Sequence, residues 1–171
     1  FEEIKLFEKG KHGYFCYRIP ALVISTQGTI LAFAEARRTN CRDDDDTDLV
    51  VKRSFDNGKT WSDLQVIADD ATNTMGNPCA VVDRETDIIW LSFTWNNQKI
   101  LLTKSTDDGM TWAEPVDITE SAKDPNWSYV GTGPGHGIQL KNGRLLIPSW
   151  GDTSPGPVTW KPDQPNWGKV Q

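Results

Sequence analysis

Short apolar runs alternate with turns rich in Gly, Asn and Asp along most of the chain. Examples are RIPALVIS (residues 18–25), TILAFAEAR (29–37) and IIWLSFTW (88–95). Runs of this length that are rich in β-branched and aromatic residues, and that end at turn residues, predict β-strands. No stretch shows a helical period of apolar residues. The pattern therefore predicts an all-β fold.

The strand pattern repeats. The stretch SFDNGKTW (54–61) returns fifty-one residues later as STDDGMTW (105–112), which gives the shared pattern S-x-D-x-G-x-T-W. Three predicted strands precede each copy, and a fourth follows it. A third unit opens at GHGIQLKNGRLLIPSW (135–150). Four antiparallel strands at this spacing are typical of β-propeller blades, whereas a β-sandwich would not repeat the turn so regularly.

The repeated turn, here called the Asp-box, has a structural explanation. An aspartate at its third position folds back onto backbone N–H groups, and the glycine supplies the positive φ of a tight hairpin. The tryptophan is expected to close the turn as an apolar plug. These ten positions are therefore predicted to be structural and not catalytic: Ser54, Asp56, Gly58, Thr60, Trp61, Ser105, Asp107, Gly109, Thr111 and Trp112.

Successive connections in an antiparallel meander alternate between two faces. Because the Asp-boxes join the third and fourth strands of a unit, they share a face with the first hairpin of that unit. The opposite face receives the loops between second and third strands and the links between units. Polar and aromatic residues gather there: Arg18, Arg37, the acidic run 43–46, Asn77, Trp95, Asn126 and Trp127. The Pro- and Trp-rich segment 151–167 belongs to the same face, which we take as the candidate site.

Composition and charge exclude several partners. The formal net charge is −6 and the pI is about 4.9, which argues against nucleic acid or an anionic membrane surface. No apolar run is long enough to predict a membrane span. The three cysteines, Cys16, Cys41 and Cys79, suggest neither a disulfide framework nor a metal site, and Cys16 and Cys79 are predicted to be buried thiols. The first residues are neither a Met start nor a signal peptide.

Several motifs together resemble the sialidase (exo-α-neuraminidase) family. They are YRIPAL (17–22), LAFAEAR (31–37), an acidic loop before DLVVKRS (48–54), the two Asp-boxes, GNPCAVVD (76–83) and GTGPGHGIQL (131–140). The resemblance implies a six-bladed β-propeller. Residues 1–171 would be one partial domain of about two and a half four-stranded blades, incomplete at the C-terminus.

The same resemblance implies an activity. Sialidases remove terminal α-linked sialic acids from glycoconjugates with retention of configuration, use no cofactor or metal, and bind a sialylated glycan. A trans-sialidase, or a non-catalytic carbohydrate-binding or interaction propeller, is the alternative. A secreted or periplasmic location is favoured.

Residue roles also follow from the resemblance. Arg18 would clamp the substrate carboxylate, as an arginine fork suits that group, and Arg37 would contact the C4 substituent and steady the acidic loop. Asp43, or alternatively Asp44, would be the acid/base. Four residues would receive the N-acyl and glycerol arms: Asn77, Trp95, Asn126 and Trp127. The tyrosine nucleophile, its glutamate partner and two further clamp arginines would lie beyond Gln171.

The residues themselves leave other interpretations open. Arg18 at a strand end could pair with a surface acid, and the acidic run 43–46 could be a solvated loop or a calcium site. Asp46 and Asp48 are expected to bond the loop backbone, and Arg38 to face solvent. Glu35, two residues before Arg37 on the same strand face, is interpreted as its supporting partner. His136 is expected to bond to backbone, and Cys41 to be unreactive.

Overall fold

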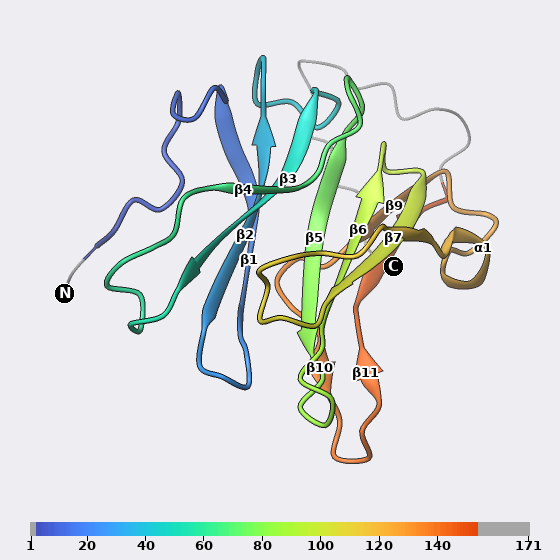
Figure 1. The fold of residues 1–171 in the computed structure, drawn as a ribbon. Helices are drawn as coiled ribbons and strands as arrows, with labels where there is room; N and C mark the ends of the chain where they lie inside the picture. Colours follow the sequence, from blue (N-terminus) through green and yellow to red (C-terminus); the bar gives the residue numbers. More distant parts are fainter. Residues whose placement is uncertain (1–2, 154–171) are drawn as a thin grey trace.

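The computed structural model describes residues 3–153 and is built from antiparallel sheets (Figure 1). The first sheet contains β1 (Cys16–Ile24), β2 (Ile30–Arg37), β3 (Thr47–Ser54) and β4 (Gln65–Ala68) in sequential order. The second contains β5 (Met75–Val82), β6 (Ile89–Trp95), β7 (Lys99–Ser105) and β8 (Val116–Asp117), also in order. The predicted all-β class and the repeated four-stranded unit are confirmed.

A third unit is a long hairpin in two pieces. β9 (Tyr129–Thr132) pairs with β12 (Ser149–Asp152), and β10 (Ile138–Gln139) pairs with β11 (Leu145–Leu146). This unit therefore opens at Tyr129, earlier than the start at residue 135 that the sequence indicated. The link before it contains one helical turn, α1 (Thr119–Ala122), which the apolar pattern did not predict. Most of the Pro- and Trp-rich segment 151–167 lies outside the described residues.

The core lies between the two four-stranded sheets. Its fully buried side chains are every second residue along the central strands β2, β3 and β6: Leu31, Phe33, Leu49, Val51, Ile89, Leu91 and Phe93. Burying each such side chain stabilises the fold by about 1.5–3 kcal/mol. Trp112 packs edge-on against Phe33 across the interface, with ring centroids 5.8 Å apart. This packing fixes the two sheets side by side, so the ends of β1, β2 and β5 meet.

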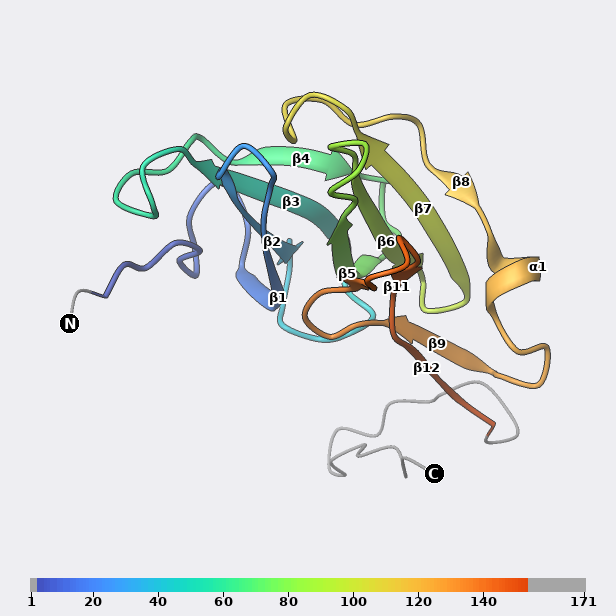
Figure 2. The ribbon, with the colours of Figure 1, turned by 90° about the horizontal axis from the view of Figure 1, so that it is seen from below.

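Connections alternate between the two ends as predicted. In Figure 1 the β1–β2 hairpin lies at the lower end of the first sheet and the β2–β3 loop at the upper end. Figure 2 views the molecule from the lower end, where the Asp-box turns after β3 and β7 lie. The residues described include no helix that is long and apolar enough to cross a membrane.

The first strand of each four-stranded unit is bulged at an X-Pro step. The β1–β2 register shifts between Arg18 and Ala21, and the β5–β6 register shifts between Gly76 and Cys79. The residue before proline has positive φ in both bulges, 49° at Ile19 and 55° at Asn77. Bulges re-aim side chains, and they are frequent beside active sites.

A disulfide corrects the cysteine prediction. Cys16 and Cys41 are bonded, with Cα atoms 5.9 Å apart, so neither is the free thiol that the sequence suggested. The wide spacing was misleading because Cys16 opens β1 opposite Arg37, the last residue of β2, and the chain then returns over Cys16. Cys79 is a free, buried thiol, as predicted, and burial raises its pKa to about 11.

Candidate active site

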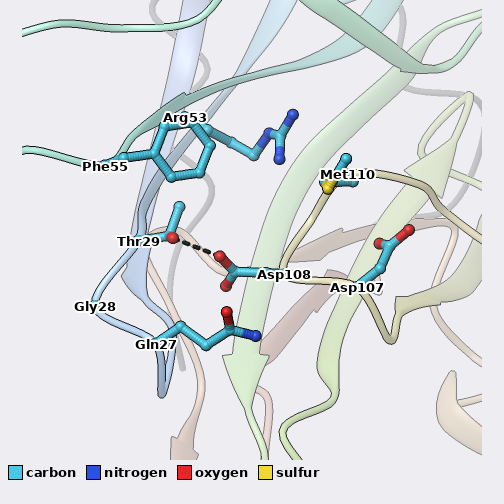
Figure 3. A pocket seen from close by; sticks show the side chains of 8 residues that line it. All are labelled: Gln27, Gly28, Thr29, Arg53, Phe55, Asp107, Asp108 and Met110. Atoms are coloured by element: carbon cyan, nitrogen blue, oxygen red, sulfur yellow. Dashed lines mark hydrogen bonds between the residues drawn. The ribbon is translucent and has the colours of Figure 1, made fainter.

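The Asp-box end holds the larger cavity, of about 480 Å³ (Figure 3). It lies between the β1–β2 hairpin and the two turns, and is lined by Gln27, Gly28, Thr29, Arg53, Phe55, Asp107, Asp108 and Met110. It contains one arginine, and its acids are bonded within the scaffold: Asp108 accepts a hydrogen bond from Thr29, and Asp107 accepts one from Thr111. The lining of this cavity therefore does not provide the paired arginines that a carboxylate clamp needs.

The Asp-box carboxylates are occupied by their own turns. Asp56 accepts hydrogen bonds from the backbone N–H of Thr60 at 2.8 Å and from Oγ of Ser54 at 2.9 Å. The Thr60 N–H is the main cause that lowers the pKa of Asp56, to about 2. Asp107 makes the same contacts in the second turn. Trp61 donates from Nε1 to the Gly58 carbonyl at 3.0 Å and closes its turn, whereas Trp112 points into the core.

A second cavity, of about 120 Å³, lies at the opposite end, where the bulged strands meet the β2–β3 loop. All three units contribute to its lining: Arg18, Ile19, Glu35, Arg37 and Asp43 from the first, Asn77 and Asn97 from the second, and Tyr129 and Trp150 from the third. Four of the residues that the sequence assigned to the site, Arg18, Arg37, Asp43 and Asn77, are thus brought together.

Two arginines converge on one carboxylate oxygen. Nη1 of Arg18 and Nη2 of Arg37 each donate to Oδ1 of Asp43 at 2.8 Å. The same two side chains also bond the Cys41 carbonyl, Arg37 at 2.7 Å and Arg18 at 3.2 Å. The Arg18 side chain is 44% exposed and the Arg37 side chain 2% exposed. Arg18 can therefore turn towards a ligand, whereas Arg37 is fixed in the protein.

Glu35 holds Arg37 in place. Oε2 of Glu35 accepts Nε of Arg37 at 3.0 Å and also Nη2, as a buried ion pair. Burial alone would lower the pKa of Arg37, but the charges of Glu35 and Asp43 outweigh burial and raise it. Oε1 of Glu35 accepts the backbone N–H of Asn77 at 2.8 Å, which ties the first blade to the bulge of the second. A Cβ at Gly76 would lie 2.7 Å from that oxygen, so the close approach requires glycine.

The other acids of the run face away from the cavity. Asp44 pairs with Arg42, and that hydrogen bond lowers the pKa of Asp44. Buried Asp45 accepts the backbone N–H groups of Thr39 and Asn40, both at 2.9 Å. Asp45 is therefore the residue whose carboxylate bonds the loop backbone, a role the sequence analysis gave to Asp46 and Asp48.

Asp46 and Asp48 instead pair with Arg38. Arg38 is exposed, as predicted, but it is not simply solvated: it also lies over the Tyr14 ring, 5.1 Å from the centroid. No group of His, Cys, Asp and Glu residues within 3–153 is arranged to hold a metal ion. Nδ1 of His136 lies 2.8 Å from the Gly137 carbonyl, a backbone contact.

Three predicted residues lie outside the cavity lining. Trp95 donates from Nε1 to Asp70 at 2.7 Å and lies against Lys99. Asn126 bonds Asp124 within its own link. Trp127 packs on Gly151, where an added Cβ would be 2.0 Å from the indole.

Tyr129 and Trp150 line the cavity instead, with ring centroids 5.0 Å apart. Burial raises the pKa of Tyr129, and the charges of Asp43 and Glu35 raise it further, so its phenol stays neutral and can donate a hydrogen bond. Neither residue was assigned to the site from the sequence: the predicted third unit began at residue 135, after Tyr129, and Trp150, inside that unit, was given no role. Gly133–Pro134, with φ of 83° at Gly133, matches the Ile19–Pro20 and Asn77–Pro78 steps, and that alignment would have placed Tyr129 near the start of the strand.

The chain is similar in sequence to known proteins. The family model for a BNR repeat-like domain matches residues 28–168. The chain belongs to this BNR repeat-like family. It is 35% identical to an exo-alpha-sialidase of Aspergillus fumigatus, over 86% of this chain and 46% of that protein. The chain thus spans less than half the length of that relative.

Solved structures of sialidases have a similar fold over this part of the chain. The chain superposes on the Hadza microbial sialidase Hz136 with a TM-score of 0.78 and 30% identity, over 84% of this chain and 34% of that one. It superposes on a leech intramolecular trans-sialidase with a TM-score of 0.77 and 14% identity, over 89% and 42% of the two chains. The resemblance to sialidases and the expected fold, part of a six-bladed β-propeller, are confirmed.

Proposed function

We propose that the complete protein is an exo-sialidase that hydrolyses terminal α-linked sialic acids by a retaining mechanism. One observation carries the proposal: a buried arginine and an exposed arginine share one carboxylate oxygen of an acidic loop, on the face opposite the Asp-boxes. The sialidase relatives add independent support.

The two arginines would have different roles, Arg18 in binding the substrate and Arg37 in holding the acidic loop. A substrate carboxylate would compete with Asp43 for Arg18, because the Arg18 side chain is 44% exposed and a guanidinium fork can donate two hydrogen bonds to a carboxylate. Arg37 stays on Glu35 and Asp43, so the acidic loop keeps a buried cation when Arg18 turns to the ligand. The other two arginines of the clamp would come from the part of the propeller beyond Gln171.

Asp43 would be the acid/base. Its side chain is 49% exposed at the cavity, where it can protonate the leaving glycosidic oxygen and later remove a proton from water. The nucleophile would be a tyrosine, an exception to the usual pair of carboxylates, and it too would come from beyond Gln171. Tyr129 does not fit that role, because a phenol with a raised pKa is harder to ionise.

The second and third blades would receive the N-acyl and glycerol arms. Asn77, Tyr129 and Trp150 present an amide, a phenol and an indole to the cavity, which suits a ligand with both polar and apolar groups. Trp95, Asn126 and Trp127 lie outside the cavity lining, and they would support these residues without contacting the ligand.

The test is an assay of the complete protein on a fluorogenic sialoside and on sialyllactose, with Arg18→Ala as the matched variant. We expect turnover, release of α-sialic acid as first product by NMR, and a large rise in KM for Arg18→Ala. Transfer to an added acceptor, or an anhydro product, would instead indicate a trans-sialidase, which the leech neighbour makes the second candidate. Binding without turnover would indicate the non-catalytic propeller.

A further inference from the structure

The disulfide joins the two elements that carry the site's charges. Cys16 is the first residue of β1, two residues before Arg18, and Cys41 lies two residues before Asp43 in the β2–β3 loop. Cys16 is buried, whereas Cys41 is exposed. A covalent bond therefore connects an immobile strand end to the exposed side of the loop that presents Asp43.

The backbone at Cys41 is part of the same arrangement. Its carbonyl accepts hydrogen bonds from Arg37 at 2.7 Å and from Arg18 at 3.2 Å, the two side chains that also hold Asp43. The loop thus presents two acceptors to one pair of arginines. Moving Cys41 would move an acceptor of both arginines and the carboxylate at once.

The non-covalent anchors of the loop are unequal. Asp45 fixes the far side of the loop through the N–H groups of Thr39 and Asn40. The near side depends on Arg18 and Arg37, and a bound carboxylate would draw Arg18 away from Asp43. The disulfide is an anchor that no anionic ligand can displace.

We propose that the Cys16–Cys41 disulfide is a positioning element that keeps Asp43 at the cavity while Arg18 turns to the substrate, so that acid catalysis depends on the redox state of this bond. The proposal rests on the sialidase function proposed above. A loop freed from Cys16 would still carry Asp43, but would hold it in the catalytic position for a smaller fraction of the time.

The chemistry of opening the bond is ordinary thiol exchange. The thiolate of an added dithiol attacks Sγ of exposed Cys41, the S–S bond breaks, and Cys16 leaves as a thiolate that takes up a proton. The second thiol of the reagent then displaces Cys41, so the protein gains two thiols and the reagent becomes a cyclic disulfide.

The experiment uses the complete protein with Cys79→Ala as parent, because Cys79 is a free buried thiol outside the cavity lining. Peptide mass spectrometry without reductant should find the Cys16–Cys41 cross-link. Parent, dithiothreitol-treated parent and Cys41→Ser are then compared on sialyllactose and on an aryl sialoside with an acidic phenol. A misplaced acid costs most when the leaving group is poor, so we expect kcat on sialyllactose to fall roughly ten- to hundredfold and kcat on the aryl sialoside to change little.

Two further measurements separate positioning from general damage. The melting temperature reports global stability, and hydrogen exchange of residues 38–46 reports the loop; the reduced protein should exchange faster there and recover on reoxidation. Equal losses on both substrates, or unchanged kinetics after complete reduction, would overturn the proposal, as would free thiols at Cys16 and Cys41. If the complete protein cleaves no sialoside, the proposed function fails, and the cross-link and loop exchange still decide whether the disulfide holds the loop.

Discussion

Nη2 of Arg37 donates a 2.8 Å hydrogen bond to Oδ1 of Asp43. The Arg37 side chain is 2% exposed, whereas the Asp43 side chain is 49% exposed. The cation is anchored in the protein and the carboxylate reaches the cavity. Asp44, one residue on, turns outwards to Arg42. The acidic run therefore offers one carboxylate to the cavity, although its four aspartates look equivalent in sequence.

Replacing Asp43 should cost most with a poor leaving group. An acid catalyst contributes about 10²–10⁴-fold where the departing oxygen needs a proton. Asp43→Ala in the complete protein should therefore lower kcat on sialyllactose by about that factor and largely spare an aryl sialoside with an acidic phenol. Steady-state kinetics on both substrates measures the ratio.

Asp44→Ala is the matched control, because it removes a neighbouring carboxylate of the same loop. It should leave the ratio of the two kcat values near that of the parent. If Asp44→Ala shows the leaving-group dependence and Asp43→Ala does not, the acid/base assignment is wrong by one residue.

The buried Glu35–Arg37 pair should be a large stability determinant. Removing one partner leaves a buried charge uncompensated, which typically costs 3–5 kcal/mol. Because Asp43 still faces Arg37, we expect Glu35→Gln to lower the free energy of unfolding by about 3 kcal/mol, at the low end of that range. Denaturant unfolding measures it, with Glu114→Gln at an exposed position as control. Equal stability of the two variants would contradict the pairing.

The fold was predictable because its signals are local. Strand alternation and the two Asp-boxes follow from side-chain period and turn chemistry, and they place Arg18, Arg37 and Asn77 on one face. The Cys16–Cys41 bond was not predictable, since it depends on the loop returning over the end of β1. Two residues twenty-five apart in sequence carry no local sign of contact.

The two cavity residues that the third unit contributes, Tyr129 and Trp150, were not predicted, for a related reason. β9 and β10 are separated by the irregular segment around Gly133–Pro134, so the apolar pattern breaks between these two strands of one unit. The predicted unit began after this break, later than the unit in the structure begins. As a result Tyr129 fell outside the predicted unit, and Trp127, in the link, was assigned to the site whereas Trp150, on the returning strand, was not.

The Asp-box carboxylates should contribute to stability in a defined pH window. The pKa of Asp56 is lowered in the folded protein to about 2, chiefly by the Thr60 N–H. A depressed pKa contributes stability that is present above the unfolded value of about 3.8 and is lost as the pH falls through about 2.

Asp56→Asn should therefore lower the melting temperature at pH 6, and the difference from wild type should shrink between about pH 4 and pH 2. Asp63→Asn, at an exposed position between the Asp-box and β4, is the control and should show little difference at either pH. A constant Asp56→Asn deficit across the whole range would show that the turn does not depend on the charge.

The cavity wall should distinguish Trp150 from Trp127. Trp150 lines the cavity, and its exposed fraction of 43% leaves the indole available to a ligand. Trp127 packs on Gly151, and it lies outside the cavity lining.

An indole that contacts the sugar equally in the ground and transition states binds both uniformly, so its loss raises KM with kcat unchanged. Trp150→Ala should therefore raise KM about tenfold, a loss of about 1.4 kcal/mol, while kcat stays within about twofold. Trp127→Ala should instead lower the melting temperature and leave KM unchanged. Steady-state kinetics and thermal unfolding of both variants decide between the roles: a KM increase confined to Trp127→Ala would support the assignment made from sequence and would exclude Trp150 from sugar binding.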